Sequence, residues 1–262
     1  MRHIILVFAL AAACARAQVP APANGEARPT LTLTPAVASA KLKPGQGWTQ
    51  VLHLRNGTAG VFRFEVQVQD VVVKDGKRTY VPGGETESSI AASAVITPRS
   101  LSIGPGEEGS ASVTLTIPLQ TALRAVVIYF RGKLDTPSED GMVGLGASLG
   151  ALVTFDLSGD YNFKVADFST SPQTETANQV LSHEVLNSGL DVVLPKGGTV
   201  ILDESGRSVG KATFPAHRIL PGESVTFSAT CPSQLKSGHY RVVSSFEFNS
   251  RIVTGSGEFS VP

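Results

Sequence analysis

The chain has few cysteines and no excess of either charge, and both shortages exclude classes of protein. Its 262 residues include two cysteines, one tryptophan, 22 basic and 22 acidic residues. Such a balance supports neither an electrostatic nucleic-acid footprint nor a polybasic membrane patch. No segment approaches the ~20 consecutive apolar residues that a membrane-spanning helix requires. We therefore predict no nucleic-acid partner and no membrane span.

The first 17 residues have the pattern of a secretory signal peptide. Arg2 and His3 provide a positive start, residues 4–13 are apolar, and Ala15-Arg16-Ala17 is a small-x-small cleavage site. This pattern predicts a protein exported to the periplasm or the cell exterior. The following segment, residues 18–29, is rich in proline and alanine without periodicity, and we expect a disordered linker there.

Loss of the signal would leave Cys231 as the single cysteine. An alternative interpretation is a lipobox at residues 11–14, in which Cys14 is acylated and anchors the exported chain. A lipobox prefers leucine where Ala11 stands, which favours simple cleavage. One cysteine forms no internal disulfide, so core burial must stabilise the fold. We interpret Cys231 as a small residue at a strand end rather than as a reactive thiol.

Alternation of apolar and polar residues with a period of two predicts β-strands along the rest of the chain. Examples are Leu31–Thr34, Val51–Leu54, Phe62–Val68, Val113–Ile117, Val126–Phe130, Phe163–Phe168, Val180–Leu186, Thr199–Leu202, Val225–Ser228, Tyr240–Phe248 and Ile252–Val261. Turn formers separate them, and Asp75-Gly76 between Val71–Val73 and Arg78–Tyr80 predicts a two-residue hairpin. No window of a dozen residues carries a helical stripe, so the predicted class is all-β.

The strand pattern starts again after residue 158, which predicts two domains. About seven short strands per ~110 residues are typical of immunoglobulin-like β-sandwiches. Pro-Gly-Glu occurs at 105–107 and again at 221–223, and a strand and a proline follow each copy. We expect sandwiches at residues 30–158 and 160–262, with Tyr240 as a tyrosine-corner residue in the second.

One long strand, Val143 to Phe155, is the main candidate for a binding site. Its apolar face consists of Val143, Leu145, Ala147, Leu149, Ala151, Val153 and Phe155, while glycine and serine dominate the other face. Strands usually have ~5–6 residues, so we expect part of this thirteen-residue strand to project beyond its partners or to lie at an edge. Such an edge pairs with another chain by β-augmentation. The alternative is a last strand whose apolar face only fills the core.

The sequence offers no convincing catalytic or metal site. Gly146-Ala-Ser148-Leu-Gly150 matches the nucleophile-elbow pattern, but that motif needs a helix after the serine, and a strand pattern follows here. The four histidines after the signal pattern lack metal-ligand spacing, so we expect surface or half-buried strand positions for them; they are His53, His183, His217 and His239. Asp135, Glu139 and Asp140 are interpreted as a solvated loop, and Trp48 as a packed residue. We predict a non-enzymatic protein without cofactor or metal.

Several of these segments resemble the amino-terminal domain of periplasmic pilus-assembly chaperones, which have a PapD-like sandwich. The matching segments are Leu52–Asn56, Thr97–Leu101, Pro105–Glu107, Val126–Phe130 and the strand from Val143 to Phe155. In that family the corresponding strand donates apolar side chains to an unfolded pilus subunit. This chain lacks the basic residue that the family places inside the strand, since Gly150 to Thr154 contains neither lysine nor arginine.

The chain also resembles the tandem immunoglobulin-like part of WxL-interacting cell-wall proteins. Pro44-Gly45, Arg55-Asn56, Leu220–Glu223 and Gly238–Tyr240 match that family. Together the two resemblances imply an exported protein that binds another chain, either a pilus subunit or a surface protein. We expect a chaperone-like assembly protein that acts by strand pairing, and the alternative is an adhesion or structural module of the cell envelope.

Overall fold

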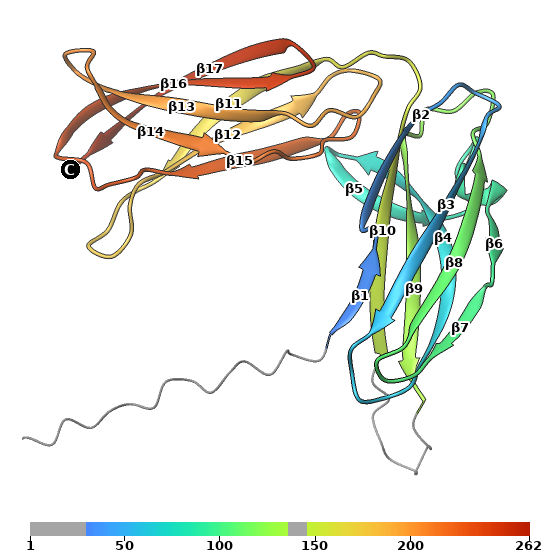
Figure 1. Ribbon diagram of the computed structural model, residues 1–262. Coiled ribbons are helices and arrows are strands. Elements are labelled where there is room, and N and C mark those ends of the chain that lie inside the picture. The colour runs from blue at the N-terminus through green and yellow to red at the C-terminus, as the bar shows by residue number, and fades with distance from the viewer. Residues whose placement is uncertain (1–29, 136–145) are drawn as a thin grey trace, which may run out of the picture.

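The computed structural model describes residues 30–135 and 146–262, and within them the chain is nearly all β. The strands form four sheets, two in each half, so the chain consists of two tandem immunoglobulin-like β-sandwiches. Figure 1 shows the sandwiches as two arms that meet at an angle. This arrangement confirms the predicted fold class, whereas the predicted signal peptide and linker lie outside the described residues.

The first sandwich contains β1 to β10. These strands are β1 (Leu31–Thr34), β2 (Val37–Lys41), β3 (Gly47–Asn56), β4 (Phe62–Lys74), β5 (Lys77–Pro82), β6 (Val95–Thr97), β7 (Ser100–Ile103), β8 (Glu108–Thr116), β9 (Ala125–Leu134) and β10 (Gly146–Asp156), with a 3₁₀ helix η1 (Ala91–Ser93). One sheet has the order β1-β3-β8-β6, and the other has the order β2-β10-β9-β4-β5, with β7 also beside β4. Asp75 and Gly76 join β4 to β5 with positive φ, which confirms the predicted hairpin.

The second sandwich contains β11 to β17. These strands are β11 (Phe163–Ser171), β12 (Val180–Asn187), β13 (Lys196–Asp203), β14 (Ser208–Phe214), β15 (Ser224–Thr230), β16 (Gly238–Phe248) and β17 (Arg251–Val261). The two sheets have the orders β11-β12-β15 and β14-β13-β16-β17. The Tyr240 hydroxyl donates to the Lys236 carbonyl at 2.7 Å, which confirms the tyrosine corner.

Each sandwich has its own core, built from the inward positions of alternating strands. Phe64, Phe130 and Phe155 are fully buried in the first, and the Trp48 ring packs edge-on against Phe155 at 5.8 Å between centroids. The prediction that Trp48 is packed is therefore confirmed. Cys231 is buried in the second sandwich, and burial raises the pKa of its thiol, which disfavours the reactive thiolate.

The expectation for His183 was wrong, because this histidine is completely buried in the second core. Its neighbours on the inward face of β12 are Leu181 and Val185, which are also buried. Nε2 lies 2.9 Å from Ser244 Oγ, and Nδ1 has no hydrogen-bond partner among the described residues. Burial lowers the pKa of the imidazole, so the ring is held in its neutral form.

Apolar packing and two ion pairs join the sandwiches. Val71, Ala125 and Val127 of the first pack with Val192 and Leu220 of the second. The Ser224 N–H also donates to the Gly76 carbonyl at 3.1 Å, and two ion pairs complete the interface. Arg78 donates to both carboxylate oxygens of Glu223, at 2.7 and 2.9 Å, and Arg124 Nε donates to Asp191 at 2.9 Å.

Asp191 also fixes the segment that connects the two sandwiches. Its carboxylate accepts hydrogen bonds from the backbone N–H groups of Leu157, Ser158 and Gly159 and from the Ser158 hydroxyl. Burial alone would raise the pKa of this carboxyl, but these donors together lower it below the ordinary value. A single buried anion therefore ties the connecting segment to both sandwiches.

Candidate functional site: an open strand edge

The edge of β10 is only half covered because the chain changes sheets near its start. β1 pairs with β3 in one sheet, and after Pro35 and Ala36 the chain crosses to the other sheet as β2. β2 then pairs in parallel with Leu152–Asp156. Within the described residues, Gly146–Ala151 therefore pairs with β9 on one side and with no strand on the other.

Hydrogen bonds next to this segment show which backbone groups face the open side. Phe155 N–H donates to the Arg124 carbonyl on the β9 side at 2.8 Å, whereas Leu152 N–H donates to the Ala36 carbonyl on the β2 side at 3.0 Å. Backbone groups alternate between the two edges of a strand. The N–H and C=O groups of Gly146, Ser148 and Gly150 therefore point to the open edge.

The predicted site residues divide into two groups along the strand. Ala147 and Leu149 are half-buried and pack against the rim of the core, beside the open edge. Ala151, Val153 and Phe155 are at most 1% exposed. The core already surrounds these three side chains, so the exposed part of the predicted site is its first half. Val143 and Leu145 lie outside the described residues.

The outer face of the sheet is bare on β10 and basic on β9. Gly146 and Ser148 lie opposite Lys133 and Arg131 of β9, and both basic residues are exposed. A cavity of about 600 Å³ lies over this region. Its lining consists of Arg63, Glu65, Gln67, Arg131, Gly132, Lys133, Gly146, Ala147 and Ser148. Sequence reasoning missed the basic residues because it followed β9 only through the apolar run that ends at Phe130.

Tyr129 marks the boundary between this basic region and the covered part of the sheet. Its ring lies 5.6 Å from the Arg131 guanidinium carbon, and it meets Tyr80 edge-on at 6.0 Å between centroids. Burial raises the pKa of the Tyr129 phenol, with a further contribution from Tyr80, while Arg131 opposes the shift. The phenol is therefore neutral at ordinary pH, and the local charge comes from the basic side chains.

Ser148, the serine of the G-x-S-x-G match, does not occupy a nucleophile elbow. It lies inside β10, which continues as a strand to Asp156. No histidine or carboxylate is hydrogen-bonded to its hydroxyl among the residues that the structure describes. The strained strand-to-helix turn that exposes a catalytic serine is not formed at this position.

β17 is another long strand with one open edge, since it pairs only with β16. It carries Arg251 and Glu258, and charged side chains on edge strands oppose pairing with other chains. The open half of β10, Gly146–Ala151, contains no charged residue. Of these two edges, the β10 edge is the better suited to accept a strand.

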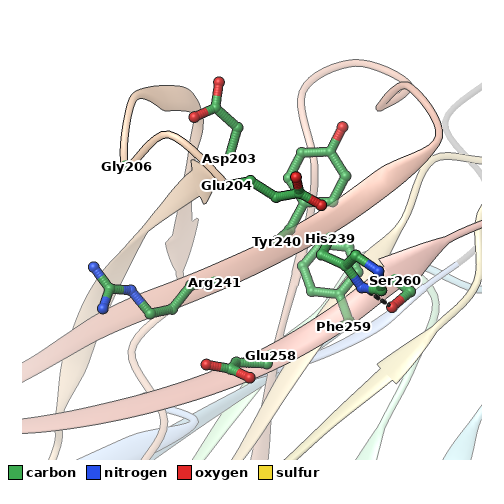
Figure 2. Close-up of a pocket in the computed structure, with 9 residues that line it drawn as sticks. All are labelled: Asp203, Glu204, Gly206, His239, Tyr240, Arg241, Glu258, Phe259 and Ser260. Carbon is green, nitrogen blue, oxygen red and sulfur yellow. Dashed lines mark hydrogen bonds between the residues drawn. The ribbon is translucent and has the colours of Figure 1, made fainter.

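A polar cavity of about 490 Å³ lies at the far end of the second sandwich, and Figure 2 shows its side chains. His239 Nδ1 lies 2.7 Å from Ser260 Oγ. The Asp203 carboxylate accepts bonds from Ser205 and Arg207 of its own turn, and these bonds, led by the Ser205 hydroxyl, lower its pKa. The Asp203 carboxylate is therefore occupied by hydrogen bonds within its own turn and is not directed at the cavity as a binding group.

The described residues contain no group of three or more histidine, cysteine or acidic side chains arranged to hold a metal ion. No helix in the part of the chain that was searched has the length and apolar character needed to cross a membrane.

No protein-family model and no curated protein matches this chain. Solved structures do show similarity. The class 5 fimbriae chaperone CfaA is 14% identical, with 89% of this chain and 100% of that chain covered and a TM-score of 0.43. A chain of the CsuC–CsuE chaperone–tip adhesion subunit complex from Acinetobacter baumannii is 13% identical, with 87% and 97% covered and a TM-score of 0.42.

A chain of the Salmonella enterica complex between the SafA pilin and the SafB chaperone is also similar. It is 11% identical, with 90% of this chain and 99% of that chain covered and a TM-score of 0.42.

Proposed function

We propose that this chain is an exported binding protein that holds a partner polypeptide by accepting its strand at Gly146–Ala151 of β10. The observation that carries the proposal is the uncharged half-edge, where Gly146, Ser148 and Gly150 direct backbone N–H and C=O groups outward. Each main-chain hydrogen bond contributes about 0.5–1.5 kcal/mol net. Main-chain bonds at three residues therefore supply part of the affinity for a short added strand and offset part of the cost of association.

Apolar contacts would add to this backbone pairing. Ala147 and Leu149 are half-buried on the inward side of the edge, and Leu31 of β1 packs on the same core from the opposite sheet. β1 belongs to one sheet and β2 to the other. On this side of the sandwich, no strand of the described chain pairs with Gly146–Ala151. A partner strand would place its inward side chains over Ala147 and Leu149 and complete the sheet.

We infer further that the partner is a subunit of an envelope structure, such as a pilus or surface protein, held before its assembly. Support comes from the secretory pattern of residues 1–17 and from the resemblance of Leu52–Asn56, Thr97–Leu101 and the β10 strand to pilus-assembly chaperones. The site of action would be the periplasm or the outer surface. An adhesion module that uses loops or sheet faces is the competing function.

A pair of substitutions at Ser148 separates these functions. Ser148→Pro removes the outward N–H and places a ring on the open edge, a position at which edge strands tolerate proline. Ser148→Ala keeps the N–H and is the matched control. Both variants are immobilised and exposed to envelope extract from the source cells, and Trp48 fluorescence during heating checks that the first sandwich stays folded.

We expect Ser148→Ala to capture a partner that Ser148→Pro does not. Hydrogen–deuterium exchange on the captured complex must then show new protection at the amides of Ser148 and Gly150. Equal capture by the two folded variants, or a partner that leaves these amides unprotected, would exclude strand addition and favour the adhesion module.

A further inference from the structure

We propose that the partner strand carries acidic side chains on its outward face and that Arg131 and Lys133 select for them. This inference deepens the proposed function and rests on strand addition at β10. It specifies the chemistry of the partner as an alternating strand, with apolar residues facing the core and aspartate or glutamate facing outward.

The outer face of β9 changes character along its length. Near the second sandwich, Ala125 and Val127 are buried against that domain. Farther along the same face, Arg131 and Lys133 are exposed and lie opposite Ser148 and Gly146, in the half of β10 that has an open edge. The basic residues therefore lie beside the only part of β10 that accepts another strand.

The spacing of strands allows these side chains to reach a partner. Neighbouring strands are about 4.8 Å apart, so a strand added to β10 lies roughly 10 Å from β9. Between them the outer face of β10 has only Gly146 and Ser148, and the cavity of about 600 Å³ lies above them. An extended arginine or lysine and a carboxylate on the added strand together span this gap.

The charged residues that line the cavity are three basic residues and one acidic residue, Glu65. Arg63 on β4 is paired with Asp135 at 3.3 Å, and Glu65 on β4 lies directly opposite Arg131, on the side of β9 that faces away from β10. Within the described residues, neither Arg131 nor Lys133 forms an ion pair within 4.0 Å. An acidic strand is thus attracted and a basic strand is repelled.

Three synthetic nine-residue peptides test the inference on the full chain. All have valine at alternate positions, and the intervening positions carry glutamate, glutamine or lysine. Affinity is measured by fluorescence anisotropy at low and high salt. The proteins are wild type, the Ser148→Pro variant, the double variant Arg131→Glu with Lys133→Glu, and the charge-matched control Lys164→Glu with Lys211→Glu on exposed positions of the second sandwich.

We expect the glutamate peptide to bind wild type and the control about tenfold more tightly than the lysine peptide, because two exposed ion pairs form in one case and are replaced by repulsion in the other. Added salt must reduce the difference. The Arg131→Glu, Lys133→Glu variant must bind the lysine peptide more tightly than the glutamate peptide. Ser148→Pro must weaken the binding of all three peptides.

Two different failures are distinguishable. If the three peptides bind equally well and Ser148→Pro weakens them all, strand addition holds and the charge inference is overturned. If no peptide binds, or if Ser148→Pro leaves binding intact, strand addition itself fails and the charge inference fails with it.

Discussion

Replacing Asp191 with alanine is expected to destabilise the protein more than any exposed carboxylate substitution. The carboxylate is fully buried, and Arg124 beside it is 10% exposed at its side chain. The substitution leaves the guanidinium without its counter-ion and leaves the N–H groups of Leu157, Ser158 and Gly159 without their acceptor. Breaking a buried ion pair in this way costs about 3–5 kcal/mol.

Urea unfolding measures this cost, followed by circular dichroism and by the fluorescence of Trp48, the single tryptophan. Asp203→Ala is the matched control, because Asp203 also accepts several hydrogen bonds, but it does so in a surface turn where its side chain is 20% exposed and its partner Arg207 is 79% exposed. Equal losses in Asp191→Ala and Asp203→Ala would refute the argument, since burial would then make no difference to the free energy of unfolding.

The same substitution has a pH signature. The folded-state pKa of Asp191 is lower than its unfolded value, which is about 3.9. Its contribution to stability is therefore fully present above that unfolded value and is lost as pH falls through the folded pKa. In Asp191→Ala this part of the loss of stability at acidic pH should disappear. If the free energy of unfolding fell with decreasing pH as steeply as in the wild type, the lowered pKa of Asp191 would be contradicted.

Three further predictions test the second core and the open edge. Burial lowers the pKa of His183, so the contribution of the neutral ring to stability should be complete above about pH 6.5 and should fall as pH drops from there toward the folded pKa. His183→Gln should flatten this slope in thermal melts, and an unchanged slope would contradict the argument. Gly257→Ala should lower the free energy of unfolding in urea by about 1–3 kcal/mol, because the added Cβ would lie 2.0 Å from Cδ1 of Phe168. In the free chain, exchange measured by NMR should be fast at the Ser148 amide and slow at the Leu149 amide, and equal rates would contradict the backbone orientation.

Local patterns predicted local structure well. The Asp75-Gly76 turn needed positive φ at two successive residues, and aspartate and glycine adopt it readily, so the hairpin followed from the dipeptide. The burial of His183 was also present in the pattern, since Leu181, His183 and Val185 share one face of a strand. The prediction for His183 followed the usual exposure of histidine instead of this alternation, and it was therefore wrong.

Long-range pairing could not be read from the sequence. Alternation placed Leu149 and Phe155 on one face, but it did not show that β2 covers the edge beside Phe155 and leaves the edge beside Leu149 open. That difference depends on where a segment more than a hundred residues earlier changes sheets. The pairing of Arg124 with Asp191 across the two sandwiches depends equally on tertiary structure.

The two contacts that cover β10 fall on the same half of the strand. β2 covers its edge from Leu152 onward, and the second sandwich covers the adjoining outer face, where Leu152 and Val127 pack against its apolar residues. The half from Gly146 to Ala151 is free of both contacts. A strand added there does not compete with the residues that hold the two arms together, so binding need not be offset by loss of the interface. The angle between the arms shown in Figure 1 should therefore be the same in the free and the bound protein, and small-angle scattering of both forms would show a change if binding opened the interface.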